Sequence, residues 1–123
     1  MKSQEIFNRV LTHLRKQGRV SMKFTPGHGI TCAYRGYAGS MCAVGCLISD
    51  EAYDPDFEGE SVNGERVEAA LKASIGRVTE RQFDLLLRLQ TAHDDYIAKG
   101  MGEWEKQMQQ IANQFNLKYA PPA

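Results

Sequence analysis

The segment from Thr79 to Lys99 carries the clearest helix signal in the chain. Thr79 and Gln82 have the spacing of a capping box, in which each side chain accepts a hydrogen bond from the backbone N–H of the other residue. Gly100 follows as a stop signal. Apolar residues within the segment point in several directions, which is typical of a helix buried on most sides. We therefore expect this helix to be central, with the rest of the chain packed around it.

Three other segments repeat apolar residues at helical spacing. The first begins near Ser3, an expected N-cap, and ends before Gly18. The second follows Asn63, again an expected cap, and the third carries Trp104 and Phe115 on one face. Helices are therefore expected at residues 3–17, 64–75, 79–99 and 103–116.

Residues 30–44 show the pattern of a β-hairpin. Ile30 to Arg35 alternate and are rich in β-forming residues, residues 36–40 supply a turn, and residues 41–44 can return as the partner strand. Residues 42–48 are apolar throughout and too short for periodicity to separate strand from helix. We expect a strand that ends near Cys42 and leads into a short buried helix. Residues 54–64 are acidic and broken by proline and glycine, which predicts a surface loop.

Together these segments predict a single α+β domain over residues 1–123, mostly helical, with four to five helices and one hairpin. The length of 123 residues fits one domain. The chain is 42% hydrophobic and 24% charged, which is ordinary for a globular protein. No disulfide or metal ion is needed to stabilise the fold, because a chain of this size can bury about two-thirds of its unfolded surface.

Charge and cysteine content indicate the class of partner and the cell compartment. The formal net charge is zero, whereas nucleic-acid-binding proteins usually carry a basic excess, so a nucleic-acid partner is not expected. No apolar run approaches the roughly 18 residues of a membrane span. Three cysteines are an odd number, and the sequence opens directly into an amphipathic pattern with no apolar signal core. These features favour a reducing, cytoplasmic compartment.

Four potential zinc ligands lie within nineteen residues: His28, Cys32, Cys42 and Cys46. A structural zinc site needs four such ligands in a tetrahedron, but this spacing lacks the close cysteine pair of a zinc finger. Cys42 and Cys46 would converge only if the intervening residues were helical. The favoured interpretation is that the cysteines are small buried apolar residues; a zinc-stabilised hairpin module remains an alternative, and no cofactor is expected.

A second alternative is a small cysteine-dependent enzyme. Cys42 is placed near an expected strand-to-helix junction, where a helix N-terminus can lower the pKa of a thiol. His93 would be the base and Asp94 the group that orients it. The sequence contains no phosphate-binding loop, no dinucleotide-binding glycine motif and no common hydrolase motif. We therefore lean away from an enzyme.

Aromatic and charged side chains around the expected hairpin are candidate contacts for a partner, because tyrosine and arginine are favoured at interfaces. The expected contact surface is the hairpin with the acidic loop behind it, within residues 34–60. Its candidate binding residues are Tyr34, Arg35, Tyr37, Asp50, Glu51 and Tyr53.

The sequence also carries the pattern C-x-Y-R from Cys32, followed by C-A-V-G-x-L-I-x-D-E-x-Y from Cys42 to Tyr53. With Leu89-Gln90 and His93-Asp94 later in the chain, this pattern resembles a family of small uncharacterised proteins of tailed bacteriophages and prophages. The resemblance covers about residues 30–115. It implies the cytoplasm of a bacterial host cell, and it implies no activity, cofactor or catalytic residue.

The leading hypothesis is a non-enzymatic binding or regulatory protein of phage or prophage type that engages a host or phage protein. The Cys-Ala-Val-Gly sequence is interpreted as a packing motif, in which small residues let the hairpin and the central helix approach closely.

Overall fold

The computed structural model describes all 123 residues and has four α-helices and one two-stranded antiparallel hairpin. The long helices are α1 (Ser3–Gln17), α2 (Glu65–Ile75), α3 (Glu80–Tyr96) and α4 (Met101–Gln114). The hairpin consists of β1 (Met22–Thr25) and β2 (Gly29–Cys32). Four short 3₁₀ turns complete the chain: η1 (Tyr37–Gly39), η2 (Gly45–Leu47), η3 (Pro55–Phe57) and η4 (Ile97–Lys99). The expected mostly helical α+β fold is confirmed.

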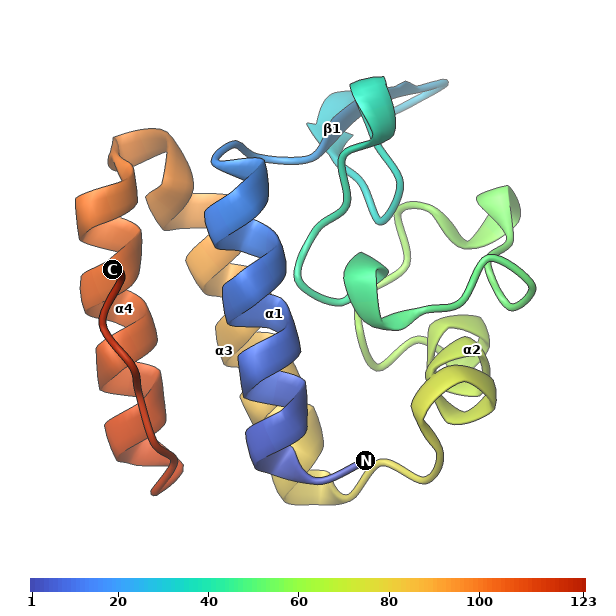
Figure 1. Ribbon diagram of the computed structural model, residues 1–123. Coiled ribbons are helices and arrows are strands. Elements are labelled where there is room, and N and C mark those ends of the chain that lie inside the picture. The colour runs from blue at the N-terminus through green and yellow to red at the C-terminus, as the bar shows by residue number, and fades with distance from the viewer.

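Helices α1, α3 and α4 stand side by side, while α2 lies on the other side of the loops that follow the hairpin (Figure 1). Helix α3 packs against both α1 and α4, as expected of the central helix. One continuous apolar core joins these helices with η2 and α2. Its largest fully buried side chains include Trp104, Phe7, Phe57, Leu86 and Met108. None of the helices is long and apolar enough to cross a membrane.

The helices lie within three residues of their expected bounds, with α3 ending at Tyr96 and α4 running from Met101 to Gln114, but two of the expected caps are wrong. The capping box of α3 is confirmed, because Thr79 Oγ1 accepts from the Gln82 N–H at 3.1 Å and Gln82 Oε1 accepts from the Thr79 N–H at 3.1 Å. Ser3, however, is the first helical residue, and Lys2 is the N-cap of α1. Asn63 does not cap α2 either: Gly64 occupies that position, and the Asn63 side chain accepts the Ser61 hydroxyl instead.

The hairpin lies earlier in the chain than residues 30–44. Its turn is Thr25 to His28, closed by a bond from the His28 N–H to the Thr25 carbonyl at 2.9 Å, with Gly27 at φ 83°. The expected return strand at 41–44 supplies only an isolated bridge between Arg35 and Met41. The physical reason is the Pro-Gly turn at 26–27, which reverses the chain direction and places residues 22–25 beside 29–32. Residues 29–32 therefore pair with the preceding segment and not with residues 41–44.

After Cys42 the chain turns into a short helical segment, as expected. The Cys46 N–H donates to the Cys42 carbonyl at 3.1 Å, and η2 follows directly. Cys42, Ala43, Val44 and Gly45 are all buried there. This segment packs against α1, and its Gly45 lies directly against the backbone of Tyr34, in the loop that follows β2.

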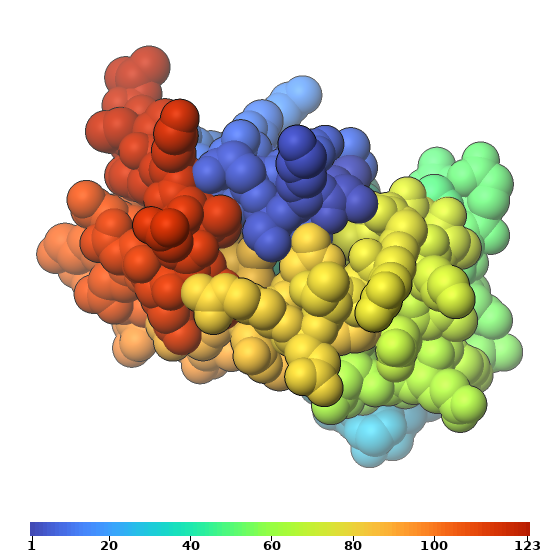
Figure 2. Space-filling model, turned by 90° about the horizontal axis from the view of Figure 1, so that it is seen from below, coloured from blue at the N-terminus to red at the C-terminus, as the bar shows by residue number.

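Both chain ends are tied to the helical layer. The terminal ammonium of Met1 donates to the Ile75 carbonyl at 2.9 Å, and Gln82 Nε2 donates to the Met1 carbonyl at 2.9 Å. Near the other end, the Lys118 N–H donates to Gln4 Oε1 at 2.8 Å. Seen from below, the start of the chain therefore lies between the C-terminal segment and the connection from α2 to α3 (Figure 2).

Candidate functional site

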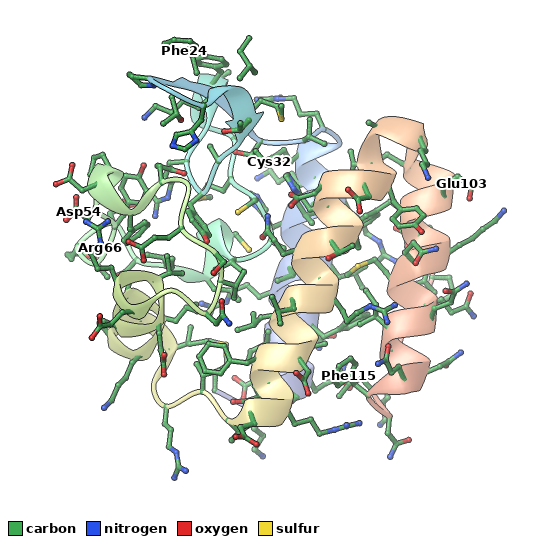
Figure 3. All side chains as sticks on the ribbon, turned by 180° about the vertical axis from the view of Figure 1, so that it is seen from behind. Phe24, Cys32, Asp54, Arg66, Glu103 and Phe115 are labelled. Carbon is green, nitrogen blue, oxygen red and sulfur yellow. The ribbon has the colours of Figure 1, made fainter.

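A cavity of about 430 Å³ lies where the hairpin meets helix α3. One wall is β2 with the residues next to it, the second is the loop at 59–62, and the third is the face of α3 that carries Gln90 and Asp94. Cys32 and Cys42 both line the cavity, and Figure 3 shows Cys32 at the base of the hairpin beside α3. The volume is in the range of small-ligand pockets.

His93 is fully buried beside this cavity and links α3 to the start of the hairpin. Its Nε2 lies 2.9 Å from the backbone nitrogen of Ser21, and its Nδ1 lies 2.7 Å from Asp94 Oδ1. A backbone N–H can only donate, so Nε2 must be the acceptor and the ring proton sits on Nδ1. His93 is therefore a neutral imidazole that donates to Asp94 and accepts from Ser21.

This tautomer bears on metal binding. Cys32, His93 and Asp94 form the one group of three metal-capable side chains in the chain, with ligand atoms all within 4.8 Å of one another. The ring nitrogen that faces Asp94, however, carries the proton, and the other is occupied by Ser21. A metal ligand needs a free nitrogen lone pair. The hydrogen bond between His93 and Asp94 thus accounts for the closeness of those two groups, while the Cys32 thiol donates to Met22 Sδ.

Gln90 extends the same network toward the Cys-Ala-Val-Gly segment. Its Nε2 donates to Asp94 Oδ1 at 3.0 Å, and its Oε1 accepts from the Val44 N–H at 3.1 Å. One carboxylate oxygen of Asp94 thus accepts from both His93 and Gln90. The network joins α3, the start of the hairpin and the turn after Cys42 into one rigid unit.

The two residues of the alternative catalytic pair sit in different environments. Cys42 Sγ accepts the Gly45 N–H at 3.3 Å, and both nitrogens of His93 are bonded to other groups. Burial raises the pKa of the Cys42 thiol to about 12, and the charge of Asp94 adds to the rise. A catalytic thiol needs the opposite shift and a base that can take its proton. This arrangement does not activate Cys42 as a nucleophile.

The four residues of the alternative zinc set are not brought together. His28 is exposed at the hairpin turn, at the rim of the cavity. Cys46 faces a separate hollow beside Arg9 and His13 on α1, and its thiol donates to the Ala43 carbonyl at 3.1 Å. His28, Cys32 and Cys42 line the same cavity, but Cys46 does not, and the four side chains do not converge on one point.

All three thiols are expected to react slowly with alkylating reagents. Burial raises the pKa of Cys32 and of Cys46 to about 12, as it does that of Cys42. At pH 8 such a thiol is about one part in ten thousand thiolate, far below a free thiol of pKa about 8.5. Iodoacetamide labelling followed by mass spectrometry should show rates at least about a hundredfold below those of the same protein in urea. Rapid labelling of Cys42 in the folded protein would contradict this expectation.

Three of the six candidate binding residues are engaged inside the molecule. The Glu58 carboxylate accepts from the backbone N–H groups of Tyr34 and Arg35, at 2.9 and 3.0 Å, and from the Tyr53 hydroxyl at 2.7 Å. Arg35 also bonds Asp50 at 2.7 Å and stacks over the Tyr53 ring. These contacts fix the acidic loop against the chain that follows β2, so Tyr34, Arg35 and Tyr53 form part of the scaffold.

The other candidates are exposed, and two apolar residues join them. Tyr37 is 56% exposed, and Asp50 and Glu51 lie on the surface. Phe24 and Ile30 are partners across the hairpin and are 55% and 65% exposed. Figure 3 shows Phe24 at the outer end of the hairpin, directed away from the body of the protein. We call Phe24, Ile30 and Tyr37 the hairpin patch.

Sequence reasoning named Tyr37 but missed Phe24 and Ile30, because the hairpin was expected too late in the chain. A signal was present: Met22 and Phe24 alternate with polar residues just before the Pro-Gly turn. The Gln90–Asp94 contact also had a signal, since residues four apart share a helix face. Ser21 carried none, because its part is played by a backbone N–H.

A scan against protein-family models, a search of curated proteins and a search of solved structures each find no significant match to this chain.

Proposed function

We propose that this protein is a non-enzymatic binding module that engages another protein through its hairpin patch. The observation that carries the proposal is the exposure of Phe24 and Ile30, which pair across a projecting two-stranded hairpin. Large apolar side chains grouped on a protein surface commonly mark an interaction site.

The hairpin explains why these two side chains are left uncovered. Side chains alternate along a strand, so Met22 and Cys32 lie on the same face as Phe24 and Ile30. The Met22–Cys32 pair is partly buried at the base of the hairpin, with the two sulfurs 3.7 Å apart. The same apolar face continues outward to Phe24 and Ile30, where nothing in the chain covers it. A partner protein would complete this face.

Two further features fit a binding module held on a rigid base. The buried His93 network fixes the first residues of the hairpin to α3, and Tyr37 fixes its outer part through a 2.9 Å bond from the Phe24 N–H to the Tyr37 hydroxyl. A surface held in place in this way loses little conformational freedom on binding. The bacterial cytoplasm and a phage or prophage origin are the setting that we propose, with a host or phage protein as partner. The three free cysteines agree with a reducing compartment.

The double variant Phe24→Ser, Ile30→Ser is expected to lose partner capture by at least about tenfold, since anchor residues at interfaces contribute about 1–2 kcal/mol or more each. Its free energy of unfolding should change by less than about 1 kcal/mol, because both side chains are mostly exposed. Capture from a bacterial lysate at low salt, measured by quantitative mass spectrometry, tests the first expectation, and urea unfolding tests the second.

The matched control is Gln110→Ser, on the exposed surface of α4. It should capture the same protein as the wild type. Equal recovery of that protein by the double variant, or recovery of no specific protein by the wild type, would count against the proposal.

A further inference from the structure

The two outer edges of the hairpin differ in what covers them. In an antiparallel pair, residues alternate between those whose backbone groups bond across the pair and those whose groups point outward. The Ala33 N–H donates to the Ser21 carbonyl at 2.9 Å, and the register pairs Met22 with Cys32 and Phe24 with Ile30. Ser21 and Ala33 are thus a hydrogen-bonded pair, whereas Met22–Cys32 and Phe24–Ile30 are non-hydrogen-bonded pairs, whose backbone N–H and C=O groups point outward from the hairpin.

The edge of β1 is covered. The outward N–H of Phe24 donates to the Tyr37 hydroxyl, which confirms that the backbone groups of Phe24 point away from β2. Next to it, Gly36 lies so close to β1 that a Cβ atom there would be 2.7 Å from the Met22 carbonyl oxygen. The chain after β2 thus folds back over the β1 edge, where Tyr37 bonds the Phe24 N–H and Gly36 leaves no room beside Met22.

The edge of β2 is open. The backbone groups of Ile30 and Cys32 have no hydrogen-bond partner outside the hairpin. This edge borders the cavity between the hairpin, the loop at 59–62 and α3. Unpaired strand edges of this kind can pair with an added strand from another chain.

The cavity beside this edge favours a cation. Asp94 and Glu60 both line it, and no lysine or arginine does. The Glu60 carboxylate is already paired with Arg66, so Asp94 is the carboxylate left to meet a cation. Asp94 Oδ1 accepts from His93 and Gln90, which leaves Oδ2 available, and 34% of its side chain is exposed. Cys32 lies beside Asp94 on one side, and the exposed Ile30 is two residues away on the same face of the strand.

We propose that the open edge of β2 binds an extended segment of the partner protein as a third strand, with a lysine or arginine of that segment reaching Asp94. This inference rests on the proposed function and specifies the partner's chemistry. The residue that pairs with Cys32 would point to the same face as Cys32 and meet Asp94. The residue of the added strand that pairs with Ile30 would lie two positions from the basic residue and would place an apolar side chain beside Ile30. The expected motif is thus a basic and an apolar residue separated by one position.

A second copy of this chain fits the edge less well. Pairing of two β2 edges would bring the Asp94 carboxylates of both copies toward the same short ladder, where like charges repel. A separate partner with a basic residue is complementary to this edge instead. We therefore expect the protein alone to be monomeric by analytical ultracentrifugation.

Peptides selected on the wild-type protein from a displayed library of random twelve-residue sequences test the proposal. The selected peptides should be enriched in a basic and an apolar residue two positions apart. Amide hydrogen exchange of Ile30 and Cys32 should slow at least about tenfold when a selected peptide binds. The variant Ile30→Pro removes one outward N–H that lies outside the β1–β2 ladder, and it should bind at least about tenfold more weakly than Ile30→Ala, which loses the same side chain but keeps the N–H. Ile30→Val should bind like the wild type.

The outcomes separate this inference from the proposed function. One outcome would overturn the added strand while the hairpin patch stands: the selected peptides do not bind the Phe24→Ser, Ile30→Ser variant, but they bind Ile30→Pro as well as Ile30→Ala and leave the two amides unprotected. Selection of acidic peptides, or a dimer that Ile30→Pro dissociates, would also overturn it. Failure to select any peptide, together with no captured protein, would remove both. Circular dichroism of Ile30→Pro, matched to the wild type, checks that the hairpin variant is folded.

Discussion

Replacing Gly45 by alanine is expected to lower the free energy of unfolding by about 3 kcal/mol, in the range of overpacked cores. A Cβ atom at this position would lie 2.1 Å from the carbonyl oxygen of Tyr34 and 2.8 Å from its carbonyl carbon. These are backbone atoms, and the N–H of the same residue is held by Glu58. The obstacle therefore cannot move aside as the end of a flexible side chain would.

The control for this change is Gly102→Ala in the first turn of α4, where a Cβ atom would meet nothing within 4 Å. Alanine is a better helix former than glycine, so this variant should be more stable than the wild type by up to about 1 kcal/mol. Urea unfolding followed by the fluorescence of the buried Trp104 measures both variants. A Gly45→Ala protein as stable as the wild type would refute the interpretation of the Cys-Ala-Val-Gly segment as a packing motif.

His93→Leu should also destabilise the protein, by about 3 kcal/mol. Leucine fills much of the space but can neither accept from Ser21 nor donate to Asp94. The Ser21 nitrogen would then be a buried donor without a partner, and an unsatisfied buried polar group costs about 1–3 kcal/mol. Loss of the bond to the Asp94 carboxylate adds to this cost, since bonds to charged groups are the stronger ones.

Asp95→Leu is the matched control, because it makes the same kind of change at the next residue, which is exposed. It should alter stability by less than about 0.5 kcal/mol. Hydrogen exchange gives a second readout: in His93→Leu the Ser21 amide should lose its protection, whereas in Asp95→Leu it should keep it. Unchanged stability of His93→Leu would mean that the network does not hold the hairpin to α3.

The helices could be predicted because their signals are local. A stripe of apolar residues, the Thr79–Gln82 box and the glycine at position 18 each act within a few residues, and each is found where expected. The hairpin was misplaced because strand pairing depends on which turn forms. The alternation of residues 30–35 is the same whether they pair with an earlier or a later segment of the chain. The Pro26-Gly27 turn selects the earlier segment, residues 22–25.

The site was less predictable than the fold. The segment around Cys42 was singled out, and Cys42 lines the cavity, but its expected partners were chosen by residue type. His28 is close to Cys32 in sequence, yet the hairpin turn places it at the rim of the cavity. The contacts of His93 depend on a backbone N–H at Ser21, seventy-two positions away. Contacts between a side chain and distant backbone leave no trace in residue type or spacing.

The packing of α1 has a consequence for synthesis on the ribosome. Its buried stripe packs against η2, α3 and α4, and Arg15 in its last turn forms a bidentate pair with Glu105 of α4, at 2.6 and 3.0 Å. The turn η2 is translated before α3 and α4, which come only in the second half of the chain, so the part of the stripe that faces α3 and α4 stays exposed to solvent until then. Nascent chains that stall before α4 should therefore be held by chaperones or degraded, and the native state should appear late and in one step.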